Sequence, residues 1–166
     1  MGTRIAPLMQ GGAQERGLRG GTENVAGIVG LGRAIEKATG NIPERTERIR
    51  VLRDRLIRGV LEGIPEARLN GDPDRRLPGN AHFSFPGVDG EALLLRLDLM
   101  GIACSGGSAC TSGSPEPSHV LTAIGQGPEL AGSGLRITLG DGNTEAEIDE
   151  TLAALKRLVP ELRAMR

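Results

Sequence analysis

Residues 135–159 read LRITLGDGNTEAEIDETLAALKRLV, which joins a strand pattern to a helix pattern. Apolar and polar residues alternate over Leu135–Leu139, so we expect a strand with Arg136 on the face opposite its apolar neighbours. Thr144 and Glu147 have the spacing of a capping box, which predicts the start of a helix. The apolar stripe of that helix consists of Ile148, Leu152, Leu155, Val159 and Leu162. A strand followed by an amphipathic helix is therefore predicted for the end of the chain.

The segments before this stretch predict a small sheet. Extended segments are expected at residues 67–70, 81–85 and 102–104, with helices at 89–100 and 115–124. The order from residue 67 is then strand, strand, helix, strand, helix, strand, helix. This order favours an α/β fold class with an α+β small domain, in which helices cover one face of the sheet.

The first 63 residues have a different character. Residues 1–21 contain six glycines and no apolar periodicity, so we expect an irregular loop. A helix is predicted over residues 22–39, with Thr22 or Asn24 as its N-cap. Pro43 interrupts the pattern, and a second helix is expected to run to about Glu62.

Composition excludes several classes of protein. The chain has 166 residues, a formal charge of −1, two cysteines, two Phe and no Tyr or Trp. It lacks the aromatic residues on which bases stack in proteins that bind single-stranded nucleic acid. It also lacks the excess of positive charge found in proteins that bind the phosphate backbone. No apolar run approaches the ~20 residues that span a bilayer, and no secretory leader is recognisable. We therefore expect a cytoplasmic protein that binds neither membrane nor nucleic acid directly.

The charge is unevenly distributed. Residues 1–60 hold 11 Lys or Arg against 6 Asp or Glu, whereas residues 61–166 hold 9 against 15. A basic, solvated helix face explains this pattern, and so does a docking surface for an acidic partner.

Cys110 lies within SGGSACTSGS, residues 105–114, where small and polar residues restrain the backbone little. Such a loop suits a reactive thiol, and an incidental surface cysteine remains an alternative. Cys104 follows an apolar segment and is expected to be a buried small side chain. A metal site formed by both cysteines and His119 does not match the spacing of structural zinc sites.

Two further residues are candidates for binding anions. Gly-rich segments lead to Thr22 just before a predicted helix, where backbone N–H groups and a hydroxyl suit a phosphate. Arg136 suits a carboxylate, and a surface salt bridge is the alternative.

Three motifs carry a family resemblance: GGAQERGLRGGTENV (residues 11–25), SACTSGSPEPSHVL (108–121) and LRITLG (135–140). In this order they resemble cysteine desulfurases of the iron–sulfur-assembly type, which are pyridoxal-phosphate enzymes of the class V aminotransferase superfamily. The resemblance covers essentially the whole chain. It implies the C-terminal part of a fold-type I transferase. The implied parts are a cofactor-domain remnant (residues 1–22), connecting helices (23–63) and a small domain (64–166).

The resemblance also implies roles for individual residues. Cys110 resembles the catalytic cysteine that takes sulfur from L-cysteine as a persulfide, and it is a candidate transient iron–sulfur ligand. Arg136 resembles the arginine that binds the substrate carboxylate. Thr22 resembles the residue that reaches the pyridoxal phosphate of the opposite subunit. The partners implied are an iron–sulfur scaffold or sulfur-relay protein and a second subunit.

The family's Schiff-base lysine has no counterpart here, since Lys37 and Lys156 are the chain's two lysines and neither fits its motif. We therefore expect the chain to be inactive without a separate N-terminal half. A non-enzymatic sulfur carrier and an inactive gene remnant are the alternatives. Glycines at 20, 106 and 107 replace serines common in the family, Pro115 replaces leucine, and Asp141 stands where arginine is frequent.

Overall fold

A computed structural model describes residues 5–106 and 118–165 of the chain. Its contacts form two compact units, Met1–Ile42 and Pro43–Arg166. The division into three parts at residues 22 and 63, which the resemblance implies, stays a prediction.

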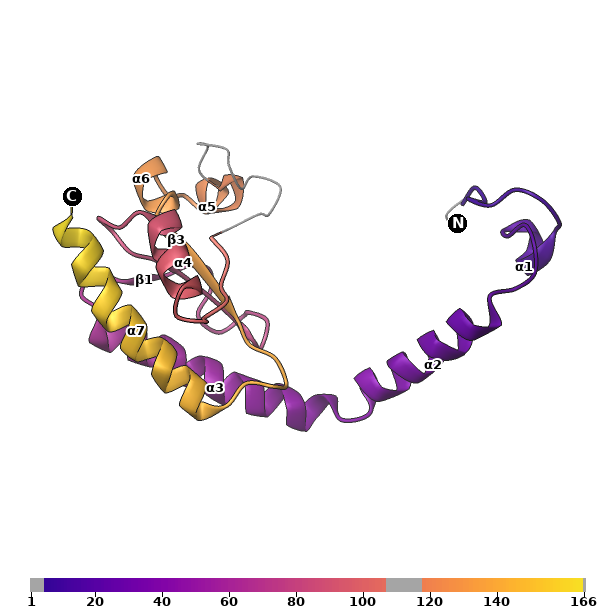
Figure 1. The fold of residues 1–166 in the computed structure, drawn as a ribbon, viewed down its shortest axis with the longest axis horizontal. Coiled ribbons are helices and arrows are strands. Elements are labelled where there is room, and N and C mark those ends of the chain that lie inside the picture. The colour runs from indigo at the N-terminus through magenta and orange to yellow at the C-terminus, as the bar shows by residue number, and fades with distance from the viewer. Residues whose placement is uncertain (1–4, 107–117, 166) are drawn as a thin grey trace. The chain divides into compact units, whose positions relative to one another are not determined.

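In the first unit, the described residues form a short turn followed by a long helix (Figure 1). The turn, α1 (Gln14–Gly17), interrupts a segment expected to be irregular throughout. The helix, α2 (Val25–Thr39), begins where Asn24 accepts a hydrogen bond from the Gly27 backbone N–H at 3.0 Å. Asn24 is therefore the N-cap, one of the two residues predicted for that position. None of the residues of α2 is buried, and its larger apolar side chains are all exposed: Val25, Ile28, Val29, Leu31 and Ile35.

The second unit is built on a three-stranded antiparallel sheet in the order β1-β2-β3. The strands are β1 (Arg68–Leu69), β2 (Asn80–Ser84) and β3 (Gly134–Thr138). Leu69 pairs with Phe83, and Phe83 pairs with Leu135. Because side chains alternate between faces along a strand, this register gathers the apolar residues on one face.

Three helices pack on that apolar face, α3 (Ile42–Gly63), α4 (Gly90–Asp98) and α7 (Glu145–Ala164). Phe83 and Leu135 are fully buried in a cluster to which all three helices contribute. The predicted stripe of α7 is confirmed, since all five of its members are buried. The prediction of a small sheet covered by helices is confirmed. Two short helices, α5 (His119–Ala123) and α6 (Pro128–Ala131), complete the unit, and α6 was not predicted.

Local capping signals set the starts of α4 and α7. The Asp89 carboxylate accepts from the backbone N–H groups of Glu91 and Ala92. Thr144 and Glu147 form the predicted capping box, with the Glu147 carboxylate accepting from the Thr144 N–H at 2.9 Å. Each bond satisfies a backbone donor that the helix itself leaves unpaired.

The strand predicted at residues 102–104 is wrong. Of this region only Ser105 pairs with the sheet, as an isolated antiparallel bridge to Arg136. Residues 101–104 form no ladder with β3, and together with residues of β3 and α7 they line a cavity of about 340 Å³. Ile102 and Cys104 pack against the core without pairing in the sheet. The strand was predicted because a short apolar segment has the same pattern whether or not it pairs with a sheet.

Candidate functional site

Four polar residues lie side by side across the sheet, on the face opposite the apolar core. The Asn70 N–H donates to the His82 carbonyl at 2.7 Å, His82 lies opposite Arg136, and Arg136 pairs with Ser105. Residues that are direct partners across strands share one face of the sheet. Asn70, His82, Arg136 and Ser105 are called the polar row below.

Arg136 is exposed on the edge strand β3, as the alternation of its segment predicted. Its Nη2 donates to the Ser105 hydroxyl at 3.2 Å. Among the described residues Arg136 forms no ion pair, so the alternative of a surface salt bridge finds no partner there. Among the described residues, no partner is found for the remaining guanidinium N–H groups, and the planar geometry of the guanidinium suits a carboxylate.

His82 belongs to a hydrogen-bonded network that the sequence did not reveal. Asn70 Nδ2 donates to His82 Nδ1 at 2.8 Å and to Ser84 Oγ at 2.8 Å. Ser84 Oγ donates to Gln126 Oε1 at 3.1 Å, and Gln126 Nε2 donates back to Asn70 Oδ1. His82 Nδ1 is therefore an acceptor, which leaves the proton of the neutral ring on Nε2.

The environment of His82 favours its neutral form. Burial lowers the pKa of the His82 imidazole, and the charge of Arg136 lowers it further. The alternation of His82 and Ser84 with buried Ala81 and Phe83 was a usable signal for their position on this face. The contact with Asn70 and Gln126 was not recoverable, because it joins residues far apart in the sequence.

Thr22 lies in the first unit, in the exposed turn that leads into α2. Gly20 in this turn donates its N–H to the Met9 carbonyl at 2.8 Å, and a Cβ at position 20 would lie 2.5 Å from the backbone of Gln10. A side chain at position 20 would therefore require the backbone at Gln10 to shift. The Thr22 hydroxyl is a donor that fits a phosphate group, whereas two backbone N–H groups at the start of α2 are already bonded, Val25 to the Glu23 carbonyl and Gly27 to the Asn24 side chain.

The two lysines lie on helices, one in each unit. Lys37 is exposed on α2, and Lys156 is exposed on α7, where its Cε lies over Gly63 of α3. The Thr22 hydroxyl thus fits contact with the phosphate of pyridoxal phosphate, and neither lysine is a member of the polar row or of the turn that holds Thr22.

Cys110 lies outside the described residues, so its predicted role stays a prediction. Cys104 is half-buried and packs against the core, close to what was expected. Burial raises the pKa of the Cys104 thiol to about 11, which makes it a poor nucleophile. Within residues 5–106 and 118–165 no three His, Cys, Asp or Glu side chains are grouped to hold a metal ion.

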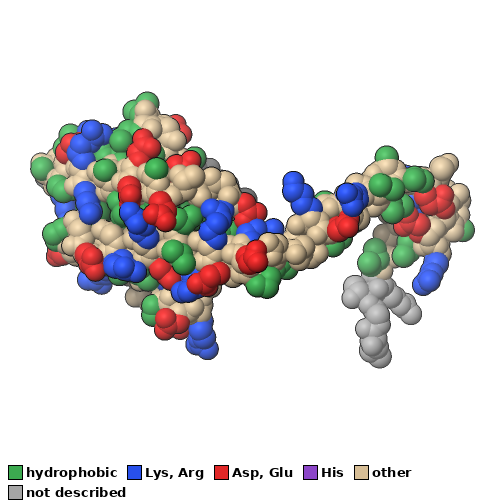
Figure 2. Space-filling model, turned by 90° about the horizontal axis from the view of Figure 1, so that it is seen from below, with side chains coloured by type: hydrophobic (Ala, Val, Ile, Leu, Met, Phe, Trp, Pro, Cys, Tyr) green, Lys and Arg blue, Asp and Glu red, His purple; other side chains and the backbone are tan. Residues whose placement is uncertain are grey.

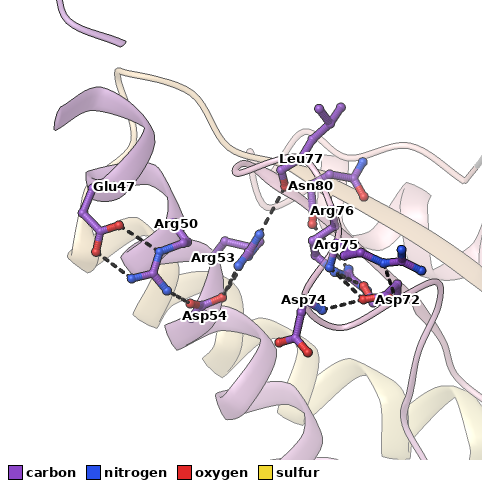
Figure 3. A network of polar contacts seen from close by, with 10 residues as sticks. All are labelled: Glu47, Arg50, Arg53, Asp54, Asp72, Asp74, Arg75, Arg76, Leu77 and Asn80. Atoms are coloured by element: carbon purple, nitrogen blue, oxygen red, sulfur yellow. Dashed lines mark hydrogen bonds and ion pairs between the residues drawn. The ribbon is translucent and has the colours of Figure 1, made fainter. Parts of the chain in front are cut away.

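The arginines of α3 are mostly paired within the second unit. Figure 3 shows Arg50 between Glu47 and Asp54, with nitrogen–oxygen distances of 2.6 and 3.0 Å. Arg55 likewise meets Asp149 of α7 at 2.8 Å. Figure 2 accordingly shows blue and red side chains interspersed over the second unit. This pairing favours a solvated helix face over a docking surface for an acidic partner.

Comparison with known proteins identifies relatives over nearly the whole chain. The model of the aminotransferase class-V family matches residues 6–151. A cysteine desulfurase IscS of Clostridium botulinum is 54% identical over 166 residues, which is 99% of this chain and 42% of that protein. An IscS-like cysteine desulfurase of Mycobacterium tuberculosis is 49% identical over 95% of this chain and 40% of that protein. The chain thus spans about two-fifths of the length of these relatives.

Solved structures also resemble nearly the whole of this chain, and the chain again matches about two-fifths of their length. A NifS-like protein has a TM-score of 0.80 at 35% identity, covering 97% of this chain and 40% of its own. A NifS-like protein of Rickettsia africae has a TM-score of 0.77 at 33% identity, covering 96% of this chain and 41% of its own.

In the described part of the chain, no helix is both long enough and apolar enough to cross a membrane.

Proposed function

Because the chain belongs to the aminotransferase class-V family, we propose that it forms the C-terminal part of a cysteine desulfurase. That enzyme converts L-cysteine to L-alanine and passes the sulfur to an acceptor, for iron–sulfur cluster assembly or thiolation. The observation that carries the proposal is Arg136, an arginine with no acidic partner among the described residues, on the polar face of the sheet. Its free donors suit the carboxylate of an amino acid substrate.

Cys110 is the proposed sulfur acceptor within the chain. Its thiolate forms an S–S bond to the sulfur of L-cysteine as the Cβ–S bond breaks, which makes Cys110 a persulfide. The substrate carbon keeps the electron pair of the broken bond and takes up a proton, which yields L-alanine. Cys104 does not compete for this role, because its raised thiol pKa leaves little thiolate.

The family's cofactor is pyridoxal phosphate, which supplies an electron sink for the substrate. Thr22 is the residue proposed to contact its phosphate. Since neither Lys37 nor Lys156 fits the motif of the family's Schiff-base lysine, we expect the chain to be inactive without a complementary N-terminal half. In the full enzyme a second subunit is expected to bring Thr22 to the cofactor.

L-cysteine as the substrate agrees with the solved structure titled SspA in complex with cysteine, which is 31% identical over 84% of this chain. The acceptor proposed is an iron–sulfur scaffold or a sulfur-relay protein. A cytoplasmic location is part of the same proposal.

The test is reconstitution. The chain is mixed with the N-terminal part of the Clostridium botulinum relative, pyridoxal phosphate and L-cysteine, and alanine release is measured. We expect activity from the mixture, none from the chain alone, and none from a mixture carrying Cys110→Ser. A correctly folded complex without activity would contradict the proposal.

The same preparation separates the non-enzymatic alternative. If a separate desulfurase loads sulfur onto Cys110 while the reconstituted mixture releases no alanine, the chain is a sulfur carrier. If neither activity is seen, the gene-remnant interpretation is favoured.

A further inference from the structure

We propose that Ser105 is a positioning residue for Arg136, holding the guanidinium in place for the substrate carboxylate. This rests on the proposed function insofar as Arg136 binds that carboxylate. The orienting contact itself does not depend on it, because it is made within the chain.

The backbone places the two residues side by side. The Ser105 N–H donates to the Arg136 carbonyl at 3.1 Å, and the Arg136 N–H donates to the Ser105 carbonyl at 2.6 Å. Direct partners of this kind have Cβ atoms only about 5 Å apart. The Ser105 hydroxyl therefore reaches the guanidinium, where it accepts from Nη2 at 3.2 Å.

The opposite neighbour of Arg136 does not perform this task. His82 is the cross-strand partner on β2, but its Nδ1 accepts from Asn70. The neutral ring consequently offers Arg136 no ring nitrogen lone pair. Within the polar row, the acceptor for the Arg136 side chain is the hydroxyl of Ser105.

The neutrality of this acceptor matters. A carboxylate at position 105 would form an ion pair with Arg136 and compete with the substrate carboxylate for the same guanidinium N–H groups. A hydroxyl restricts the flexible arginine side chain and leaves its charge available. Restricting a side chain before binding lowers the entropy lost when the ligand binds.

The first test measures the motion of Arg136 in the full chain. The NMR order parameter of the Arg136 Nε–H bond is compared between wild type, Ser105→Ala and Ser105→Thr. We expect Ser105→Ala to lower it and Ser105→Thr to retain it. The matched control is Thr138→Val, which removes an exposed hydroxyl two residues along the same strand. An order parameter unchanged by Ser105→Ala, or lowered equally by Thr138→Val, overturns the proposal.

The second test uses the reconstituted enzyme. We expect Ser105→Ala to raise KM for L-cysteine about 3- to 10-fold, the effect of one hydrogen bond, with kcat changed much less. Ser105→Thr should restore KM, and Ser105→Asp should raise it further than Ser105→Ala. A fall in kcat with KM unchanged contradicts the positioning role. A mixture without any activity contradicts the proposed function, and the NMR comparison then still decides the role of Ser105.

Discussion

His82 on β2 lies directly opposite Arg136 on β3, so a titratable ring and a permanent cation share one face of the sheet. Burial is the larger cause of the lowered pKa of His82, and the charge of Arg136 adds to it. Asn70 donates to the ring, which favours the unprotonated Nδ1 as well. The folded second unit therefore favours the neutral form of His82.

A pH dependence of stability follows from the lowered pKa of His82. Above the ordinary pKa of about 6.5 the ring is neutral in both folded and unfolded chain, and its contribution is complete. As the pH falls below that value, the unfolded chain takes up the proton first, so the free energy of unfolding decreases toward the lowered folded pKa. Urea unfolding at about pH 7.5 and about pH 5.5 measures this loss, which His82→Asn should reduce. His119→Asn, which changes an exposed histidine, is the control.

The contribution of the Arg136 charge to the lowered pKa of His82 can be measured separately. We expect Arg136→Gln to raise the pKa of His82 measured by NMR titration, but not to its ordinary value, because burial remains. An unchanged pKa would mean that the guanidinium does not act on the ring.

Asn70 is expected to be the most sensitive member of the network. It is buried and bonds to His82, Ser84 and Gln126 through one amide group. Asn70→Ala leaves these partners without their bonds and should lower the free energy of unfolding by about 2 to 3 kcal/mol. Asn80→Ala on β2 is the comparison, since the hydrogen bonds found for Asn80 use its backbone N–H and carbonyl rather than its side chain. Equal losses in urea unfolding would contradict the importance of the network.

The sequence predicted those features whose signals are local. The capping box of Thr144 and Glu147 spans three residues, so its spacing predicted it, and Asn24 was one of two N-caps predicted for α2. The bond between Asn70 and Gln126 depends on how β1 lies against the segment after α5, and no spacing encodes it. The same reason explains the wrong strand at residues 102–104. Whether an apolar segment pairs with a sheet depends on the neighbouring edge, which only the fold supplies.

A buried cation distinguishes two neighbouring acidic residues of α3. Both Glu47 and Asp54 contact exposed Arg50, but Asp54 also accepts from Arg53, which is only 5% exposed (Figure 3). Asp54→Ala leaves buried donors of Arg53 unpaired and should cost about 1 to 3 kcal/mol. Glu47→Ala removes a solvent-screened contact and should cause no measurable loss. Thermal unfolding of the two variants makes the comparison, and equal losses would contradict it.

The start of α4 depends on a glycine. A Cβ at Gly90 would lie 2.7 Å from the Gly132 carbonyl oxygen and 3.2 Å from that of Gly134, both rigid backbone atoms. Gly90→Ala should therefore destabilise the second unit by about 1 to 3 kcal/mol. Gly132→Ala is the matched control, because its Cβ would meet its nearest atom at 3.5 Å, an ordinary contact. If both variants unfold at the same urea concentration, the close approach is not limiting.

The two cysteines should differ in reactivity although only five residues lie between them. With a pKa of about 11, only about one in a thousand Cys104 thiols is ionised at about pH 8, against about a quarter for an ordinary thiol. Cys104 should therefore react with iodoacetamide more than 100-fold more slowly than a free thiol. Brief labelling of the folded chain followed by peptide mass spectrometry should find the label on Cys110 alone, and Cys110→Ser should abolish it. Labelling of Cys104 in the folded chain at the rate found in urea would show that its thiol is not protected by burial.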